Sequence, residues 1–289
     1  MKKVLACILA TTMCTAFLMG CSDKDSSNSS SSQSVTDNSV ADKPNSDSSN
    51  DSETTDESDF SYTKKNTDAL VIEKYTGTAS KVVIPTEAYS RKVNAIDSKA
   101  FKDCSHVTEI VIPAGIEVIG IGAFENCTGL TSIIIPHGVE IIEKGTFQGC
   151  TSLESVYFSA TVKKIRDYAF KGCTSLRAVT IPENVTYLGT GVFTGCTSLR
   201  SFVVPKSITE LEAETFMKCS SLTNVTFHDK MTALSVYVFL GCKNLKDVVI
   251  PESIKRIGTG AFGGCTDTNI TYPSWVDQDD KDSILSDVR

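Results

Sequence analysis

The sequence predicts a repeat solenoid of about eight or nine coils, in which one structural unit is copied end to end. The first observation is a set of eight cysteines that are spaced 23 residues apart. The second is a phenylalanine three residues before each of them, from Phe101 to Phe262. A compact globular core has no reason to keep this phase, whereas a stack of equivalent coils requires it. The cysteines are Cys104, Cys127, Cys150, Cys173, Cys196, Cys219, Cys242 and Cys265.

The first 20 residues are predicted to be a lipoprotein signal peptide. Lys2 and Lys3 precede an apolar stretch that is too short for a comfortable membrane span. It ends in Leu-Met-Gly followed by Cys21, which resembles the lipobox of bacterial lipoproteins. The resemblance implies that the chain is cut before Cys21, that this cysteine is acylated, and that the exported protein is lipid-anchored at the bacterial cell surface. The alternative is an ordinary secretory signal with an incidental cysteine.

Residues 21–60 are predicted to form a disordered tether rich in serine, aspartate and asparagine. The stretch 22–59 holds ten acidic residues and two lysines, in a chain whose net charge is −7. It has too little apolar surface to offset the entropy of ordering, and its like charges repel one another. The expected acidic tail at residues 273–289 holds five acidic residues and two basic ones. Nothing resembles the clustered basic face of a nucleic-acid-binding protein.

The repeat unit itself predicts one short strand per coil. In the copy Cys127–Gly149, the strand residues Ile133 and Ile135 are two apart and are followed by Pro136. β-Branched residues at that spacing, stopped by proline, are typical of a short strand that ends abruptly. The rest of the copy contains apolar residues and glycines, which predict an irregular or 3-10-like return segment. Stacked strands then form a parallel sheet on the concave face, with the return segments on the convex face.

The pattern I-x-x-x-A-F-x-x-C-x-x-L-x-x-I-x-I-P resembles the leucine-rich-repeat superfamily, and within it the BspA-like (Treponema-type) repeats. The resemblance covers about residues 70–272, nearly all of the solenoid predicted at residues 61–272. Ser159 and His228 depart from it, because they replace the proline that ends the strand. Members of this family are surface proteins, and some attach to host extracellular proteins or to other cells. The resemblance therefore implies adhesion or protein recognition.

The repeated cysteines allow three interpretations. Because every copy places its cysteine at the same position, a ladder of buried free thiols fits best. Disulfides between neighbouring coils are the second possibility, although parallel side-chain vectors suit a bridge poorly. Metal binding is the third, and a constant gap of 23 residues offers none of the usual paired-ligand spacings. We therefore expect no metal site.

No arrangement of residues points to catalysis. The chain has three histidines, His106, His137 and His228, and each stands at a different position of its repeat. The sequence contains no phosphate-binding glycine loop, no H-E-x-x-H motif and no nucleophile elbow. We therefore expect a protein that is not an enzyme and that carries no cofactor.

The candidate binding residues are those that alternate with the core residues along each strand and so point out of the concave face. They would recognise a protein ligand on a host or neighbouring cell. Sheet propensity alone would also explain their β-branched character. A glycan or cell-wall-binding module is the functional alternative, although it would favour several exposed aromatic residues. The candidates are Val111, Ile134, Tyr157, Arg177, Thr180, Arg200, Val203, Thr226 and Val249.

Overall fold

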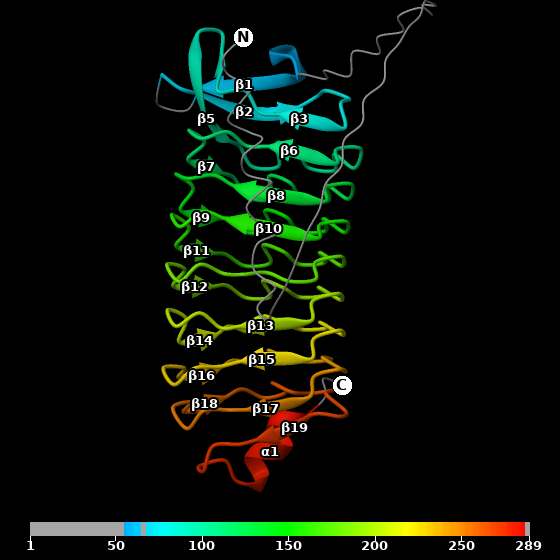
Figure 1. Cartoon of the computed structure of the whole chain (residues 1–289), viewed down its shortest axis with the longest axis vertical. Coiled ribbons are helices and arrows are strands. Elements are labelled where there is room, and N and C mark those ends of the chain that lie inside the picture. The colour runs from blue at the N-terminus through cyan, green and yellow to red at the C-terminus, as the bar shows by residue number, and fades with distance from the viewer. Residues whose placement is uncertain (1–54, 65–67, 287–289) are drawn as a thin grey trace, which may run out of the picture. The chain divides into compact units, whose positions relative to one another are not determined.

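The computed structural model describes residues 55–64 and 68–286, which form a parallel β-solenoid of about nine turns. Figure 1 shows the coils stacked one on the next, with two strand columns side by side. The predicted repeat solenoid is thereby confirmed. The expected signal peptide and residues 21–54 of the expected tether lie outside the described residues.

The first column holds the predicted strands. Its parallel pairs join equivalent positions of neighbouring coils, as Ile133 pairs with Val156. Alternate residues point inward, so the burial of β8 reads exposed, buried, exposed, buried. The column consists of β3 (Lys81–Val83), β6 (Glu109–Val111), β8 (Ser132–Ile135), β10 (Ser155–Phe158), β13 (Ser201–Val203), β15 (Asn224–Thr226), β17 (Asp247–Val249) and β19 (Asn269–Thr271).

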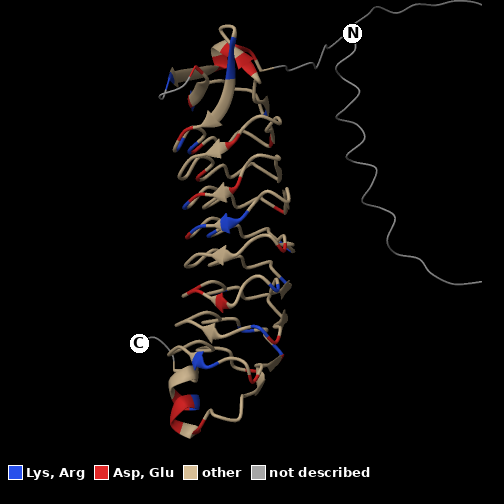
Figure 2. Ribbon diagram, turned by 90° about the vertical axis from the view of Figure 1, so that its left-hand side faces the viewer, with Lys and Arg blue, Asp and Glu red and all other residues tan. Residues whose placement is uncertain are grey.

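The return segments consist mainly of turns, as predicted, and most of them also contain a two-residue strand. Pairs such as Ile141–Ile142 place one apolar side chain in the core, and the backbone pairs with the next coil. This second column faces the viewer in Figure 2, where acidic and basic residues are interspersed along it. It consists of β5 (Arg91–Ile96), β7 (Val118–Ile119), β9 (Ile141–Ile142), β11 (Lys164–Ile165), β12 (Tyr187–Leu188), β14 (Glu210–Leu211), β16 (Ala233–Leu234) and β18 (Arg256–Ile257).

The turn after each short strand requires a left-handed backbone conformation. Gly145 and Gly149, with φ of +61° and +76°, adopt it in one coil. Glycine does so without steric cost because it has no Cβ.

Two ladders run through the core. The eight repeat phenylalanines are fully buried and follow one another with ring centroids 5.1 to 5.8 Å apart. The eight repeat cysteines are free thiols, buried except for the half-buried Cys104. Each later thiol donates to the carbonyl oxygen of the phenylalanine 26 residues earlier, as Cys127 Sγ does to Phe101 O at 3.1 Å. Every coil is thus attached to the preceding one through a side chain as well as the backbone.

The ordered unit begins earlier than the predicted boundary at residue 61. A 3-10 turn, η2 (Glu57–Asp59), leads into β1 (Phe60–Lys64), which pairs antiparallel with β2 (Leu70–Tyr75). A small hairpin joins β4 (Glu87–Ala88) to β5. Phe60 is buried against Tyr75 and Phe101, at centroid distances of 5.3 and 6.3 Å. The reason for the shift is that Phe60 covers the otherwise open end of the aromatic ladder.

The expected acidic tail contains the helix α1 (Gln278–Leu285). Asp277 and Asp280 form a capping box at its start, and acidic residues in the first turn suit the helix dipole. Ile284 is buried, and its carbonyl accepts a hydrogen bond from Phe262 N at 3.0 Å. The helix therefore covers the last coil.

Candidate interaction surface

The outward side chains of the first column form one surface, which we call the long-strand face. Its central row contains Ile134, Tyr157, Val203 and Val249, with 53 to 68% of each side chain exposed. Thr180 and Thr226 are also exposed, and Val111 is half-buried. All nine candidate residues from the sequence lie in or next to the first strand column, Arg177 and Thr180 in a segment that forms no strand.

The apolar part of the row is contiguous only near the amino-terminal end. Val83, which the sequence analysis did not include, is 46% exposed and pairs with Val111. The pattern Val-Val-Ile-Pro around it matches the strand pattern of later repeats and could have revealed it. The row continues through Ile134, which pairs with Tyr157. Further on, threonines alternate with the valines, so the large apolar side chains no longer adjoin.

A second outward row flanks the apolar one and includes two arginines on consecutive coils. Arg177 and Arg200 are exposed, and their coils are linked by a hydrogen bond from Arg200 N to Arg177 O of 3.2 Å. Neither guanidinium lies within ion-pair distance of a carboxylate in the described part of the chain. The face therefore presents uncompensated positive charge beside its apolar row.

The first column is interrupted next to these arginines. Residues 177–182 form no strand, so the column has no arrow between β10 and β13 in Figure 1. In two other coils, Ile84 N donates to Val111 O and Val204 N to Thr226 O, each at 3.0 Å. The strand pairing of the column also stops between β15 and β17. The equivalent bond from Phe158 to Thr180 is absent among the described residues.

Large core residues on both sides explain this interruption. Phe158 and Phe202 occupy inward positions where most other coils carry valine or isoleucine. Phe158 lies edge-on to Phe170, and Phe202 is buried between neighbouring rings. The widest step of the aromatic ladder, 5.8 Å between Phe170 and Phe193, lies at the same level. Extra volume in a packed core shifts the backbone, and here it separates the strands.

A cavity of about 430 Å³ opens at this interruption. Val156, Phe158 and Val179 are among its apolar lining residues, and Glu154 and Arg177 are among its polar ones. Tyr157 also lines it. The site thus joins the contiguous apolar row to the two arginines.

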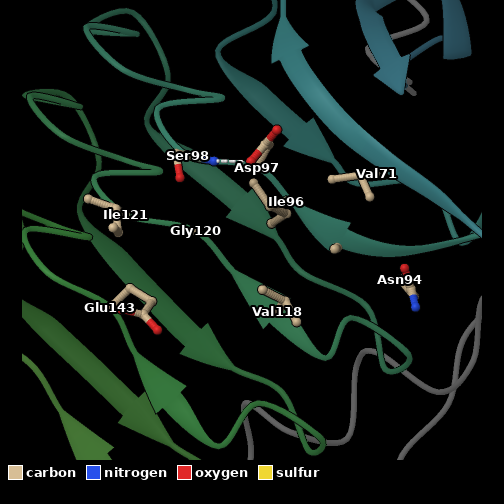
Figure 3. Close-up of a pocket in the computed structure, with 10 residues that line it drawn as sticks. Val71, Asn94, Ile96, Asp97, Ser98, Val118, Gly120, Ile121 and Glu143 are labelled. Carbon is tan, nitrogen blue, oxygen red and sulfur yellow. Dashed lines mark hydrogen bonds between the residues drawn. The ribbon is translucent and has the colours of Figure 1, made fainter. Parts of the chain in front are cut away.

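A second cavity lies on the short-strand side near the amino-terminal coils (Figure 3). Val118 and Ile121 contribute exposed apolar surface to it. Its two carboxylates make local contacts: Asp97 Oδ1 accepts from Ser98 N at 2.8 Å, and Glu143 Oε2 lies 3.3 Å from Arg166 Nε. This arrangement stabilises turns rather than aligning an acid with a base.

The titratable groups of the core are held neutral. Burial raises the pKa of the Cys150 thiol to about 12, and that of Cys173 well above its usual value. A thiol must ionise to act as a nucleophile or metal ligand, so this environment suppresses both.

His228 occupies the place of a strand-ending proline, with Nε2 2.9 Å from Pro205 O and 3.0 Å from Ile208 O. Its contacts hold the turn together.

No group of three His, Cys, Asp or Glu side chains among the described residues could hold a metal ion. None of the helices in this part of the chain is long and apolar enough to cross a bilayer. The expected lipidation site, Cys21, lies outside residues 55–286.

The repeat geometry agrees with a profile of the BspA type leucine rich repeat region, which matches in six copies over residues 94–223 and 163–283. The chain belongs to this leucine-rich-repeat family. No curated protein matches it significantly.

Two solved leucine-rich-repeat proteins support the same fold. The crystal structure of the T. pallidum leucine-rich-repeat protein is 26% identical, with a TM-score of 0.54. The match covers 75% of this chain and 91% of that chain. A leucine-rich-repeat protein from Bacteroides ovatus is 25% identical, with a TM-score of 0.50, and covers 75% of this chain and 82% of its own.

Proposed function

We propose that this BspA-type protein is a non-enzymatic, lipid-anchored surface protein that recognises another protein through its long-strand face. The observation that carries the proposal is the contiguous apolar row from Val83 to Tyr157, which continues beside Arg177 and Arg200. Exposed apolar patches with a polar edge are typical of protein contacts, and tyrosine and arginine dominate their binding energy.

In this proposal, lipidation of Cys21 anchors the protein to the outer side of the membrane, where the long-strand face can meet a partner. Acyl chains contribute about 0.8 kcal/mol for each buried CH₂ group, so a multiply acylated cysteine holds a chain firmly on a bilayer. The polar stretch that follows in the sequence would separate the solenoid from the membrane. Weak contacts of many anchored copies with one opposing surface then add up through avidity.

A binding array tests the proposal. The full chain is applied to extracellular-matrix proteins and glycans alongside the Tyr157→Glu and Val203→Glu variants. We expect saturable binding to a protein that both variants weaken by about tenfold or more, because a charge is placed in an apolar contact. Val236→Glu is the matched control, since Val236 is 41% exposed on the short-strand side.

The array has two contrary outcomes. Equal loss in the Val236→Glu control would remove the long-strand face as the contact. Binding to glycans alone would favour a cell-wall or glycan-binding module. The structure offers that alternative one strongly exposed aromatic residue in the described central row, Tyr157.

A further inference from the structure

The interruption between β10 and β13 leaves backbone groups on the long-strand face without partners. Among the described residues, Ala178, Val179 and Thr180 make no backbone hydrogen bond with either neighbouring coil. Ala178 and Thr180 are exposed and Val179 is half-buried, so water reaches this segment in the free protein. A ligand with its own backbone donors and acceptors replaces that water without leaving polar groups unpaired.

The cavity at the interruption supplies an apolar floor for such a ligand. Phe158 and Val179 are only half-buried there, although the corresponding residues Ile135 and Ile133 are buried in β8. The volume of about 430 Å³ falls within the range of small ligand sites and accommodates a large side chain. Burying one such side chain removes apolar surface of both partners from water.

The charge around the cavity favours a ligand that carries a carboxylate. Arg177 lines the cavity and Arg200 lies on the next coil, and their like charges repel each other. Glu154 also lines the cavity, but its carboxylate is not within 4.0 Å of Arg177. A ligand carboxylate placed between the two guanidinium groups relieves this repulsion and forms charge-assisted hydrogen bonds.

We propose that the interruption binds an extended acidic peptide segment of the partner, with an apolar side chain in the cavity and a neighbouring carboxylate on Arg177 and Arg200. The bound peptide replaces water at the exposed residues Ala178 and Thr180. This proposal rests on the protein-binding function above and adds where the partner is anchored and by what chemistry. The cavity selects the apolar side chain, and the two arginines select the carboxylate.

The test begins by selecting binders to the full chain from a random dodecapeptide library. Enriched peptides are synthesised, and their affinities for wild type, Arg177→Glu and Lys246→Glu are measured by fluorescence polarisation. Lys246 is the matched control, since it is an exposed cation in the same outward row three coils from Arg177. We expect the enriched peptides to carry an acidic residue beside an apolar one. We also expect Arg177→Glu to weaken binding by about tenfold or more, and Lys246→Glu by less than about twofold.

Hydrogen exchange locates the peptide independently of the variants. Amides of residues 178–180 should exchange rapidly in the free protein and become protected when the peptide is bound. Enriched peptides without an acidic residue, or unchanged exchange at these amides, would overturn the proposal. So would equal losses in both variants, or full displacement by inorganic sulfate, since either indicates a general attraction of anions.

The array of the preceding section separates failure of this site from failure of the proposed function. A protein partner whose binding is lost in Val203→Glu but unaffected by Arg177→Glu would leave the long-strand face as the contact and remove the interruption as its anchor. Unchanged melting of the Arg177→Glu protein would verify that it is folded.

Discussion

The aromatic ladder gives the sharpest stability prediction, and Phe170→Ala is the substitution that tests it. Phe170 is fully buried, with ring centroids 5.4 Å from Phe147 and 5.8 Å from Phe193. Phe158 also lies edge-on to it at 5.9 Å. The substitution therefore removes contacts to three rings from the middle of the solenoid.

The expected loss follows from the buried area. Removing about 150 Å² of buried aromatic surface at about 25 cal/mol per Å² costs about 4 kcal/mol. This agrees with the 3–5 kcal/mol that is usual for a buried phenylalanine replaced by alanine, roughly including the cavity. The neighbours cannot close the space easily, because each ring of the ladder is held by its own coil.

Guanidinium unfolding followed by circular dichroism and by tryptophan fluorescence measures the loss. The single tryptophan, Trp275, lies at the carboxyl-terminal end, where its Nε1 donates to Ile254 O at 2.7 Å. Since repeat proteins are stabilised by contacts between neighbouring coils, a weakened centre should separate the two transitions. Tyr157→Ala, in the adjoining coil segment and 53% exposed, should change stability by less than about 0.5 kcal/mol. An unchanged midpoint for Phe170→Ala would refute the ladder as a stabilising core.

Three further predictions concern the thiols, the turns and the anchor. Burial raises the pKa of the Cys150 thiol from 9.0 to about 12. The contribution of this thiol to the unfolding free energy should therefore be constant below pH 9 and fall above it, because only the unfolded chain then carries the thiolate. Urea midpoints at pH 7.5 and 10 measure this fall. Lys218 has φ of +62° and Gly172 of +75°, so Lys218→Gly should stabilise by about 0.5–1 kcal/mol and Gly172→Ala destabilise by about 1 kcal/mol in thermal melts. Cys21→Ala should move the protein from the membrane fraction to the soluble fraction and abolish labelling by an alkyne fatty acid.

Each of these three predictions has a result that would contradict it. An unfolding midpoint that stays level from pH 7.5 to 10 would mean that the thiols ionise as easily in the folded chain. Gain of stability in Gly172→Ala would contradict the strained turn, because only backbone atoms of Gly149 lie within 4 Å of the new Cβ, at 3.8 Å and beyond. Continued labelling of Cys21→Ala would place the acyl chains elsewhere.

The sequence predicted the solenoid because its period is a direct consequence of stacking. Phe101 to Phe262 and the alternation at Ile133 and Ile135 determine which side chains point inward, and the structure agrees. The helix α1 was missed because acidic residues dominate its composition, although Asp277 and Asp280 carry a capping-box pattern. The two-residue strands were missed because so short a segment has no period of its own.

The interruption of the first column could not be predicted from the pattern. Residues Ala178 to Ile181 occupy the same repeat positions as the strands around them, and we attribute their separation to the packing of Phe158 and Phe202. Thr180 is exposed, as the strand pattern predicts, but its segment pairs with no neighbouring strand. Local sequence determines direction, whereas pairing depends on volumes in adjacent coils.

A solenoid of equivalent coils presents nearly the same surface at every step, so a partner could bind it in several registers. Contacts with the apolar row supply affinity but do not distinguish Ile134 on one coil from Val203 three coils away. We infer that register is set by features that the coils do not share equally: the contiguous row ending at Tyr157, the charges of Arg177 and Arg200, and the cavity that Tyr157 and Arg177 line. Moving one of the two charges by one coil, in the variant Arg200→Thr with Thr223→Arg, keeps composition and face unchanged and separates it from Arg177 by two coils. If register is set in this way, that variant should bind the selected peptides about tenfold more weakly than wild type does. Equal binding would show that any two basic side chains in the row suffice.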